Sequence, residues 1–138
     1  MTRAYFTDRD LGKRFPETLS SAGLDVERHH DRFPPDGPDE QWLEHCGRTG
    51  RIAITHNERI RYTPNELAAV NQHRVALLVV VGKVPLAELA LNFVQTLPRI
   101  EEFVDRHRPP YIAKVYRPAV LSLERKTAQG SIVLWYPT

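Results

Sequence analysis

Three oxygen-bearing side chains, far apart in the sequence, each stand where a short apolar segment or a loop ends. Asp8 follows the apolar run Ala4–Thr7, Asp39 follows a proline-rich loop, and Asn57 follows the apolar run Ile52–Thr55. Hard divalent cations prefer oxygen ligands, and Mg²⁺ needs only one or two carboxylates when water and phosphate complete its coordination. A metal held this way polarises a phosphate and activates water for hydrolysis. We therefore take Asp8, Asp39 and Asn57 as candidate metal-binding and catalytic residues.

Each of these residues also has a purely structural interpretation. Asp8 is a preferred helix N-cap, Asp39 is favoured in a first helical turn by the helix dipole, and Asn57 is of a type common in turns. Asp10 and Glu58 are further candidate metal ligands. As charged residues near predicted loops, these two acids can equally be solvated surface charge.

Neighbouring side chains suit supporting roles and RNA binding. Thr55 can orient a ligand or simply end a strand. Affinity for nucleic acid depends largely on basic residues that contact phosphates. Three such residues follow Asp8 and are candidate RNA contacts: Arg9, Lys13 and Arg14. Their alternative interpretation is an exposed basic surface on a helix.

Zinc and cysteine chemistry are disfavoured. The histidines show no compact zinc-ligand spacing, and only one cysteine is available to complete such a site. That cysteine, Cys46, falls on the apolar face of a predicted helix and is better explained as a core residue. The sequence also contains no Gly-rich phosphate loop and no G-x-S-x-G nucleophile motif.

The composition is that of an ordinary globular domain. The chain has 138 residues, of which 41% are hydrophobic and 26% charged, enough for one sizeable core. A net charge of +2 permits a nucleic-acid partner without arguing for one. The single cysteine fits a reducing compartment, and the longest apolar run, Val75–Val81, is far below the roughly 20 residues that span a bilayer. We expect one domain over residues 1–138, located in the cytoplasm, with no membrane partner.

The candidate residues require a sheet that brings the ends of several strands together. Apolar and alternating runs predict strands at Ala4–Thr7, Leu24–His29, Arg51–Thr55, Arg74–Val81 and Tyr111–Tyr116. Helical spacing predicts helices at Leu11–Ala22, Asp39–Cys46, Pro64–His73, Pro85–Leu97 and Arg99–His107. Thr63 and Glu66 have the spacing of a capping box at one helix start. This alternation predicts an α/β fold with a mainly parallel sheet and helices on both faces, in which ligands bind at the carboxyl edge of the strands.

The C-terminal segment lies outside the alternation. Ala119–Glu124 and Ser131–Tyr136 are predicted as strands of a β-hairpin, joined by a turn through Ala128, Gln129 and Gly130. The apolar residues of this hairpin need a partner surface, which is either the sheet edge or another chain. We therefore divide the domain into an α/β core over residues 1–117 and a hairpin extension over residues 118–138.

Three segments of the sequence resemble the acidic motifs of PIN-like domains, which include the VapC-type toxins of bacterial toxin–antitoxin pairs. The segments are Phe6–Leu11, Pro38–Leu43 and Ile52–Asn57, and the resemblance covers roughly residues 4–81 and more loosely extends to residue 116. It implies a three-layer α/β/α sandwich and an endoribonuclease that uses Mg²⁺ or Mn²⁺. It also implies RNA as the substrate and a cognate antitoxin protein as a partner, with a homodimer as a further assembly.

Under this resemblance Asp8 matches the first acid of the family and Asp39 the second, but Asn57 stands where the family usually has an acid. A neutral amide can ligate through its carbonyl, yet it removes a negative charge and should weaken metal binding. Three functions therefore stay open. The first is an active metal-dependent ribonuclease, the second is a catalytically weak or inactive module that docks a partner protein, and the third is a small-molecule phosphoester hydrolase.

Overall fold

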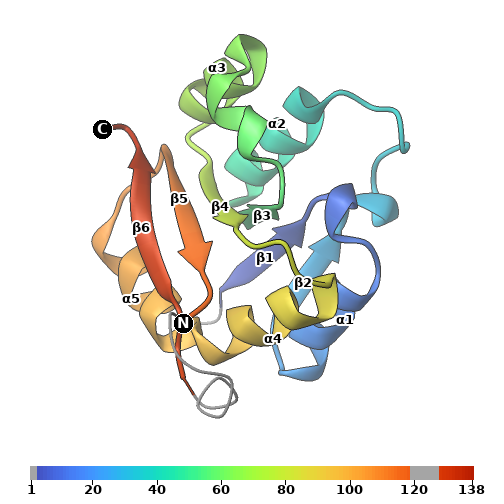
Figure 1. Ribbon diagram of the computed structural model, residues 1–138. Helices are drawn as coiled ribbons and strands as arrows, with labels where there is room; N and C mark the ends of the chain where they lie inside the picture. Colours follow the sequence, from blue (N-terminus) through green and yellow to red (C-terminus); the bar gives the residue numbers. More distant parts are fainter. Residues whose placement is uncertain (1–2, 119–127) are drawn as a thin grey trace.

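Among the residues that the structure describes, six strands form the sheet at the centre of the molecule (Figure 1). The computed structural model describes residues 3–118 and 128–138. In sequence order the strands are β1 (Ala4–Thr7), β2 (Asp25–Arg28), β3 (Ile52–Thr55), β4 (Ala76–Val80), β5 (Tyr111–Tyr116) and β6 (Ser131–Tyr136). Their order across the sheet is β2-β1-β3-β4-β5-β6; the β5–β6 pair is antiparallel and the other four pairs of these strands are parallel. The predicted mainly parallel sheet is therefore confirmed.

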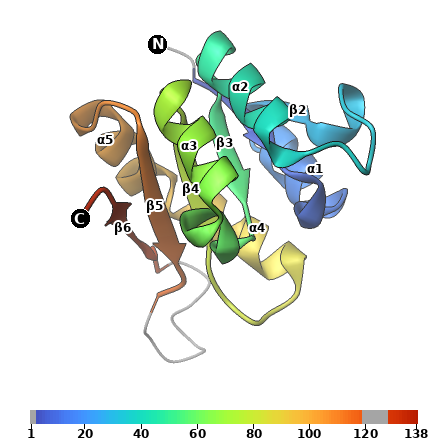
Figure 2. The same cartoon turned by 90° about the horizontal axis from the view of Figure 1, so that it is seen from above.

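Helices cover both faces of this sheet (Figure 1 and Figure 2). One face carries α1 (Arg14–Ser21), α4 (Leu86–Gln95) and α5 (Leu97–Arg106), and the other carries α2 (Asp39–Thr49) and α3 (Pro64–Gln72). The adjacent residues Tyr5 and Phe6 of β1 are both fully buried, one in each core, because successive strand residues point to opposite faces. Burial on both faces explains why the central strands are almost wholly apolar. Among the described residues, no helix has the length and apolar character needed to cross a lipid bilayer.

Helix α2 continues past its predicted end at Cys46, through Gly47 to Thr49, and ends at Gly50 in the left-handed region with φ of 75°. Gly47 does not interrupt the helix. A Cβ atom at this position would clash with the backbone carbonyl of His73, so glycine permits the close approach of α2 to the end of α3. Glycine serves here as a packing residue rather than as a helix breaker.

Strand β6 forms one edge of the sheet and corresponds to the second strand of the predicted C-terminal hairpin. In the described structure it pairs with β5, from Ser131 opposite Tyr116 to Tyr136 opposite Ile112. The sheet edge thus receives the backbone of β6, whereas the side chains of Val133 and Leu134 stay exposed. The predicted strand Ala119–Glu124 lies outside the described residues.

Each of the first three strands is followed by a short 3-10 segment at the carboxyl edge of the sheet. These segments are η1 (Arg9–Leu11), η2 (His29–Asp31) and η3 (Glu58–Tyr62). Helix α1 leads from β1 to β2 on one face, and α2 leads from β2 to β3 on the other. The chain direction across the sheet therefore switches between β1 and β3, and ligands in open α/β sheets bind at the carboxyl ends of the strands at such a point.

Candidate active site

A pocket of about 380 Å³ lies at this switch point, and we call it the acidic pocket. Its lining residues are Asp8, Arg9, Asp10, His29, Pro35, Gly37, Asp39, His56 and Asn57. Asp8 follows β1, Asp10 belongs to η1, Asn57 follows β3, and Asp39 is the first residue of α2. The fold therefore brings the three principal candidates of the sequence, Asp8, Asp39 and Asn57, to one pocket together with Asp10.

The hydroxyl of Thr55 connects three of these residues. Thr55 is fully buried, and its Oγ1 donates to Asp8 Oδ2 at 2.8 Å, with Asp10 Oδ2 at 3.3 Å as a second acceptor. The same oxygen accepts the backbone N–H of Asn57 at 3.1 Å. Because a hydroxyl carries one hydrogen, the two carboxylates share it. Thr55 thus holds both acids against the turn that begins at Asn57.

The carboxyl group of Asp8 is unusually basic. Burial, followed by the charges of Asp10 and Asp39, raises the pKa of Asp8 to about 7. Hydrogen bonds from Thr55 Oγ1 and from the backbone N–H of Arg9, at 2.7 Å, act in the opposite direction. A carboxyl group whose pKa is raised by burial and by neighbouring acids marks a site with too little positive charge for its acids, and a divalent cation is one way to supply that charge.

Asp10 contributes a second perturbed acid to the pocket. Its carboxylate accepts the backbone N–H of His56 at 3.2 Å, which fixes its position relative to β3. Desolvation and the charge of Asp39 raise the pKa of Asp10, while the contacts with His56 and Thr55 lower it. The pocket therefore opposes full ionisation of its acids as a group.

Asp39 has an acidic neighbour that the sequence pattern did not reveal. Asp39 Oδ1 accepts from Trp42 Nε1 at 3.0 Å, and Glu66 of α3 lies close enough for Asp39 to change its pKa. Burial, then the charges of Asp39 and Glu40, raises the pKa of Glu66 to about 7. The predicted capping box is wrong, because Thr63 Oγ1 donates to the carbonyl of Arg59 instead of capping α3. Glu66 is consequently free to face Asp39.

Two histidines that the sequence argument set aside also line the acidic pocket. His56 Nδ1 lies 2.9 Å from the carbonyl oxygen of Val80, so in the neutral ring Nδ1 carries the hydrogen and Nε2 is an acceptor. His29 is buried against the rings of Phe6 and Phe33. Burial and then Arg9 lower the pKa of His29, so its ring is neutral at pH 7. The only signal in the sequence is that His56 directly follows a predicted strand and His29 is the last residue of another.

Glu58 and Arg14 lie away from the acidic pocket. The side chain of Asn57 caps η3 by accepting the backbone N–H of Arg59 at 3.0 Å, so the chain turns immediately after the pocket. Glu58 then forms an ion pair with Lys114 of β5, with Oε1 and Nζ 3.0 Å apart. Glu58 is therefore not placed to replace the acid that Asn57 lacks, and Arg14, which opens α1, does not line the pocket either.

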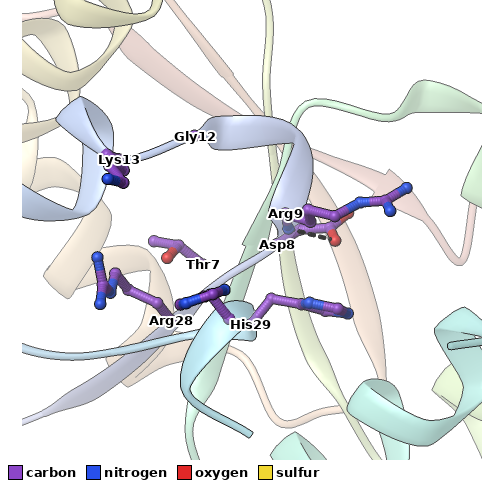
Figure 3. A pocket seen from close by; sticks show the side chains of 8 residues that line it. Thr7, Asp8, Arg9, Gly12, Lys13, Arg28 and His29 are labelled. Carbon is purple, nitrogen blue, oxygen red and sulfur yellow. Dashed lines mark hydrogen bonds between the residues drawn. The ribbon is translucent and has the colours of Figure 1, made fainter. Parts of the chain in front are cut away.

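The other two basic candidates border a second, smaller pocket of about 170 Å³ between the ends of β1 and β2 (Figure 3). We call it the basic pocket, and its lining residues are Thr7, Asp8, Arg9, Gly12, Lys13, Arg28, His29 and His30. Arg9 lines both pockets and donates from Nη1 to the carbonyl oxygen of Pro35. Lys13 lines the basic pocket alone.

The donors of the acidic pocket fit a hard divalent cation. They are carboxylate and amide oxygens, and their mutual repulsion is the condition that a cation relieves. Within residues 3–118 and 128–138, no three His, Cys, Asp or Glu side chains come close enough to enclose an ion by themselves. An ion at this site therefore needs water or phosphate oxygens to complete its coordination, as Mg²⁺ usually does.

Comparison with known proteins identifies the family of this chain. A family model described as PIN like domain matches residues 4–82, which is more than half of the chain and runs from β1 past the end of β4. No curated protein and no solved structure matches the chain significantly. The matched region contains Asp8, Asp39 and Asn57 and the strands whose ends form the acidic pocket. The chain belongs to the PIN-like domain family.

Proposed function

We propose that this protein is a metal-dependent endoribonuclease that hydrolyses phosphodiester bonds at the acidic pocket. The observation that carries the proposal is the convergence of Asp8, Asp10 and Asp39 in one pocket, where burial and mutual repulsion raise the pKa of Asp8 to about 7. Membership of the PIN-like family supports a nuclease as the class of enzyme.

Five of the lining residues, together with Thr55, have a role in this proposal. Asp8 and Asp39 would hold Mg²⁺ or Mn²⁺, and Asn57 Oδ1 and Asp10 would supply further oxygens. A cation bound there would polarise the phosphate and activate water for in-line attack. Thr55 fixes the Asp8 carboxylate, and Arg9 at the pocket offers positive charge to the substrate.

Asn57 limits the strength of the metal site. Its Oδ1 already accepts one hydrogen bond, from the backbone N–H of Arg59, so a metal would use the second lone pair of the carbonyl. The amide also lacks the charge that the corresponding acid brings. We therefore propose weak metal binding in the free enzyme, with substrate phosphate improving it.

The biological setting that we propose is that of a VapC-type toxin held inactive by a cognate antitoxin. The family resemblance supports this setting, and the neighbouring gene tests it. A gene for a small DNA-binding protein next to this one is the expected finding for a toxin–antitoxin pair.

The central test compares RNA cleavage by the native protein and by Asp8→Asn, with Mg²⁺ and with Mn²⁺. Asparagine keeps the size of the side chain and an acceptor for Thr55, so loss of cleavage reports the lost charge. Asp25→Asn is the matched control, since Asp25 starts β2 at the opposite edge of the sheet and pairs with Arg51. Equal cleavage by the native protein and Asp8→Asn would remove the nuclease proposal.

A partner-docking module is the second candidate function, and the edge of the sheet favours it. Two large hydrophobic side chains of β6 are exposed, Val133 by 51% and Leu134 by 40%, and Tyr62 of η3, whose ring lies 5.8 Å from that of Trp135, is exposed by 72%. Lys114 Nζ, which is ion-paired with Glu58, lies 3.9 Å from the ring centre of Trp135 on the same strand pair and holds that ring in place. Calorimetric titration with Mn²⁺ separates the two functions, because binding that Asp39→Ala abolishes counts against an inert module. A panel of nucleotide substrates tests the third alternative, a small-molecule phosphoester hydrolase.

A further inference from the structure

The basic pocket directly adjoins the acidic pocket, and the two share Asp8, Arg9 and His29 as their common boundary. Lys13 comes from the segment between η1 and α1, whereas Arg28 ends β2. The basic pocket is thus built from two chain segments that the parallel pairing of β1 and β2 holds side by side. A substrate in the acidic pocket can therefore reach it without leaving the carboxyl edge of the sheet.

The side chains on the two sides of this boundary carry opposite charges: acids line the acidic pocket, and Lys13 and Arg28 line the basic pocket. Figure 3 shows Lys13 and Arg28 on one side of Thr7, whereas the Asp8 carboxylate points away from both. The hydrogen bonds from Thr55 and from the Arg9 backbone hold that carboxylate toward the acidic pocket. It is consequently not available to neutralise the cations of the basic pocket.

Of these two cations, Lys13 is the one left without a carboxylate partner in the described structure. No ion pair involves Lys13 within the described residues, and Arg28 pairs with Asp31 through Nη2 at 3.0 Å. The N-terminus of α1 lies next to Lys13, and its helix dipole adds positive potential at this point. The pocket therefore presents a net attraction for an anion beside a site that attracts a cation.

The size of the basic pocket selects the kind of anion. Pockets that enclose drug-sized ligands measure about 300–1,000 Å³, whereas this one measures about 170 Å³. It fits a compact group rather than a whole nucleotide. Phosphate is such a group, and lysine and arginine are its usual side-chain partners.

From this arrangement we propose that the basic pocket is a phosphate subsite, which binds one phosphate of the RNA while a neighbouring phosphodiester lies in the acidic pocket. The proposal deepens the nuclease function and rests on it. Two sources supply the phosphate, an internal phosphodiester or a 5′-terminal phosphate, and both offer the same oxygens to Lys13 and Arg28. The subsite sets the position of the chain relative to the acids, and thereby the bond that is cut.

Binding is measured by fluorescence anisotropy with short single-stranded RNA in EDTA, so that neither metal binding nor cleavage contributes. Lys13→Ala is expected to weaken binding by roughly three- to tenfold and to reduce the salt dependence by about one phosphate contact. Arg108→Ala is the matched control, because Arg108 is an exposed cation that precedes β5 at the opposite edge of the sheet. Equal affinities of the native protein and Lys13→Ala would overturn the proposal.

Two RNAs that differ only in a 5′-phosphate or a 5′-hydroxyl identify the source of the phosphate. Tighter binding of the phosphorylated RNA, lost in Lys13→Ala, assigns the pocket to a terminal phosphate. Equal binding of the two RNAs, weakened in both cases by Lys13→Ala, assigns it to an internal phosphodiester. Thermal unfolding of each variant verifies that the fold is retained.

Inorganic phosphate separates this proposal from the proposed function. In a titration followed by amide NMR, phosphate is expected to shift the signals of Lys13, Arg28 and His30, and shifts confined to other regions would overturn the subsite. If the protein binds phosphate at this pocket but does not cleave RNA, the subsite is supported and the nuclease function is contradicted. If the native protein cleaves RNA but Lys13→Ala binds RNA with unchanged affinity, the nuclease function is supported and the subsite is contradicted.

Discussion

The Thr55 hydroxyl donates a 2.8 Å hydrogen bond to the buried carboxylate of Asp8, and this contact joins the ends of the adjacent strands β1 and β3. Both residues are almost completely buried, so the orientation of the Asp8 carboxylate is determined by the protein before any ligand binds. Preorganisation of this kind lowers the cost of positioning a metal or substrate. The contact also gives the acidic pocket its most specific experimental test.

Thr55→Val removes the hydroxyl while keeping the shape of the side chain. We expect RNA cleavage to fall at least tenfold, because the Asp8 carboxylate loses a donor that orients it and favours its charged form. Thr55→Ser keeps the hydroxyl and is expected to retain most of the activity. Cleavage rates of the two variants at one metal concentration provide the measurement, and equally active variants would contradict the role of the hydroxyl.

The stability of the metal-free protein is expected to fall as the pH rises from about 4 to about 7. The pKa of Asp8 is about 7 in the folded state against 3.8 for the ordinary side chain, so in this window the folded state binds more protons than the unfolded state. Glu66, whose pKa is also raised to about 7, acts in the same direction. Urea unfolding in EDTA across this pH range measures the effect.

Asp8→Asn should reduce this pH dependence, since asparagine does not titrate. We expect the free energy of unfolding at pH 8 to rise by about 1–2 kcal/mol, because a buried charge near other acids is removed. At pH 4 the native protein and the variant are expected to be nearly equal in stability. Parallel pH profiles of the two proteins would show that Asp8 is not the titrating group.

Mn²⁺ is expected to stabilise the native protein, and more strongly at pH 8 than at pH 6, because protons compete with the metal for Asp8. A free metal concentration of 100 times Kd corresponds to about 2.7 kcal/mol of stabilisation. Thermal unfolding with and without Mn²⁺ gives the shift in Tm. Asp39→Ala is expected to abolish this shift in Tm. An unchanged shift in that variant would show that the metal binds outside the acidic pocket.

Asn57→Asp restores a carboxylate to the position where the family usually has one. Aspartate also accepts backbone N–H groups at a cap, so η3 should be retained. We expect Mn²⁺ affinity to rise about tenfold, because an added negative charge strengthens the binding of a hard cation. The rate of RNA cleavage should increase with the affinity. Asn57→Ser keeps a capping oxygen without the charge, and an equal gain in both variants would show that capping, not charge, is responsible.

The fold was largely predictable because its signals are local. Short apolar runs, helical spacing and proline or glycine boundaries mark β1 to β5 and the helices, and a parallel sheet then brings Asp8 and Asn57 to one edge. Gly47 shows the limit of this approach. Its type suggests the end of a helix, but its role is set by the backbone of His73, which is distant in the sequence.

The sequence by itself determined which residues follow the strands, and so which side chains reach the carboxyl edge of the sheet. Only the tertiary structure decided their direction and partners. The cap by Asn57 turns Glu58 toward Lys114, the packing of α3 against α2 brings Glu66 to Asp39, and the pairing of β1 with β2 places Lys13 beside Arg28. These outcomes depend on contacts between distant segments, because periodicity specifies which element a residue belongs to but not what lies opposite it.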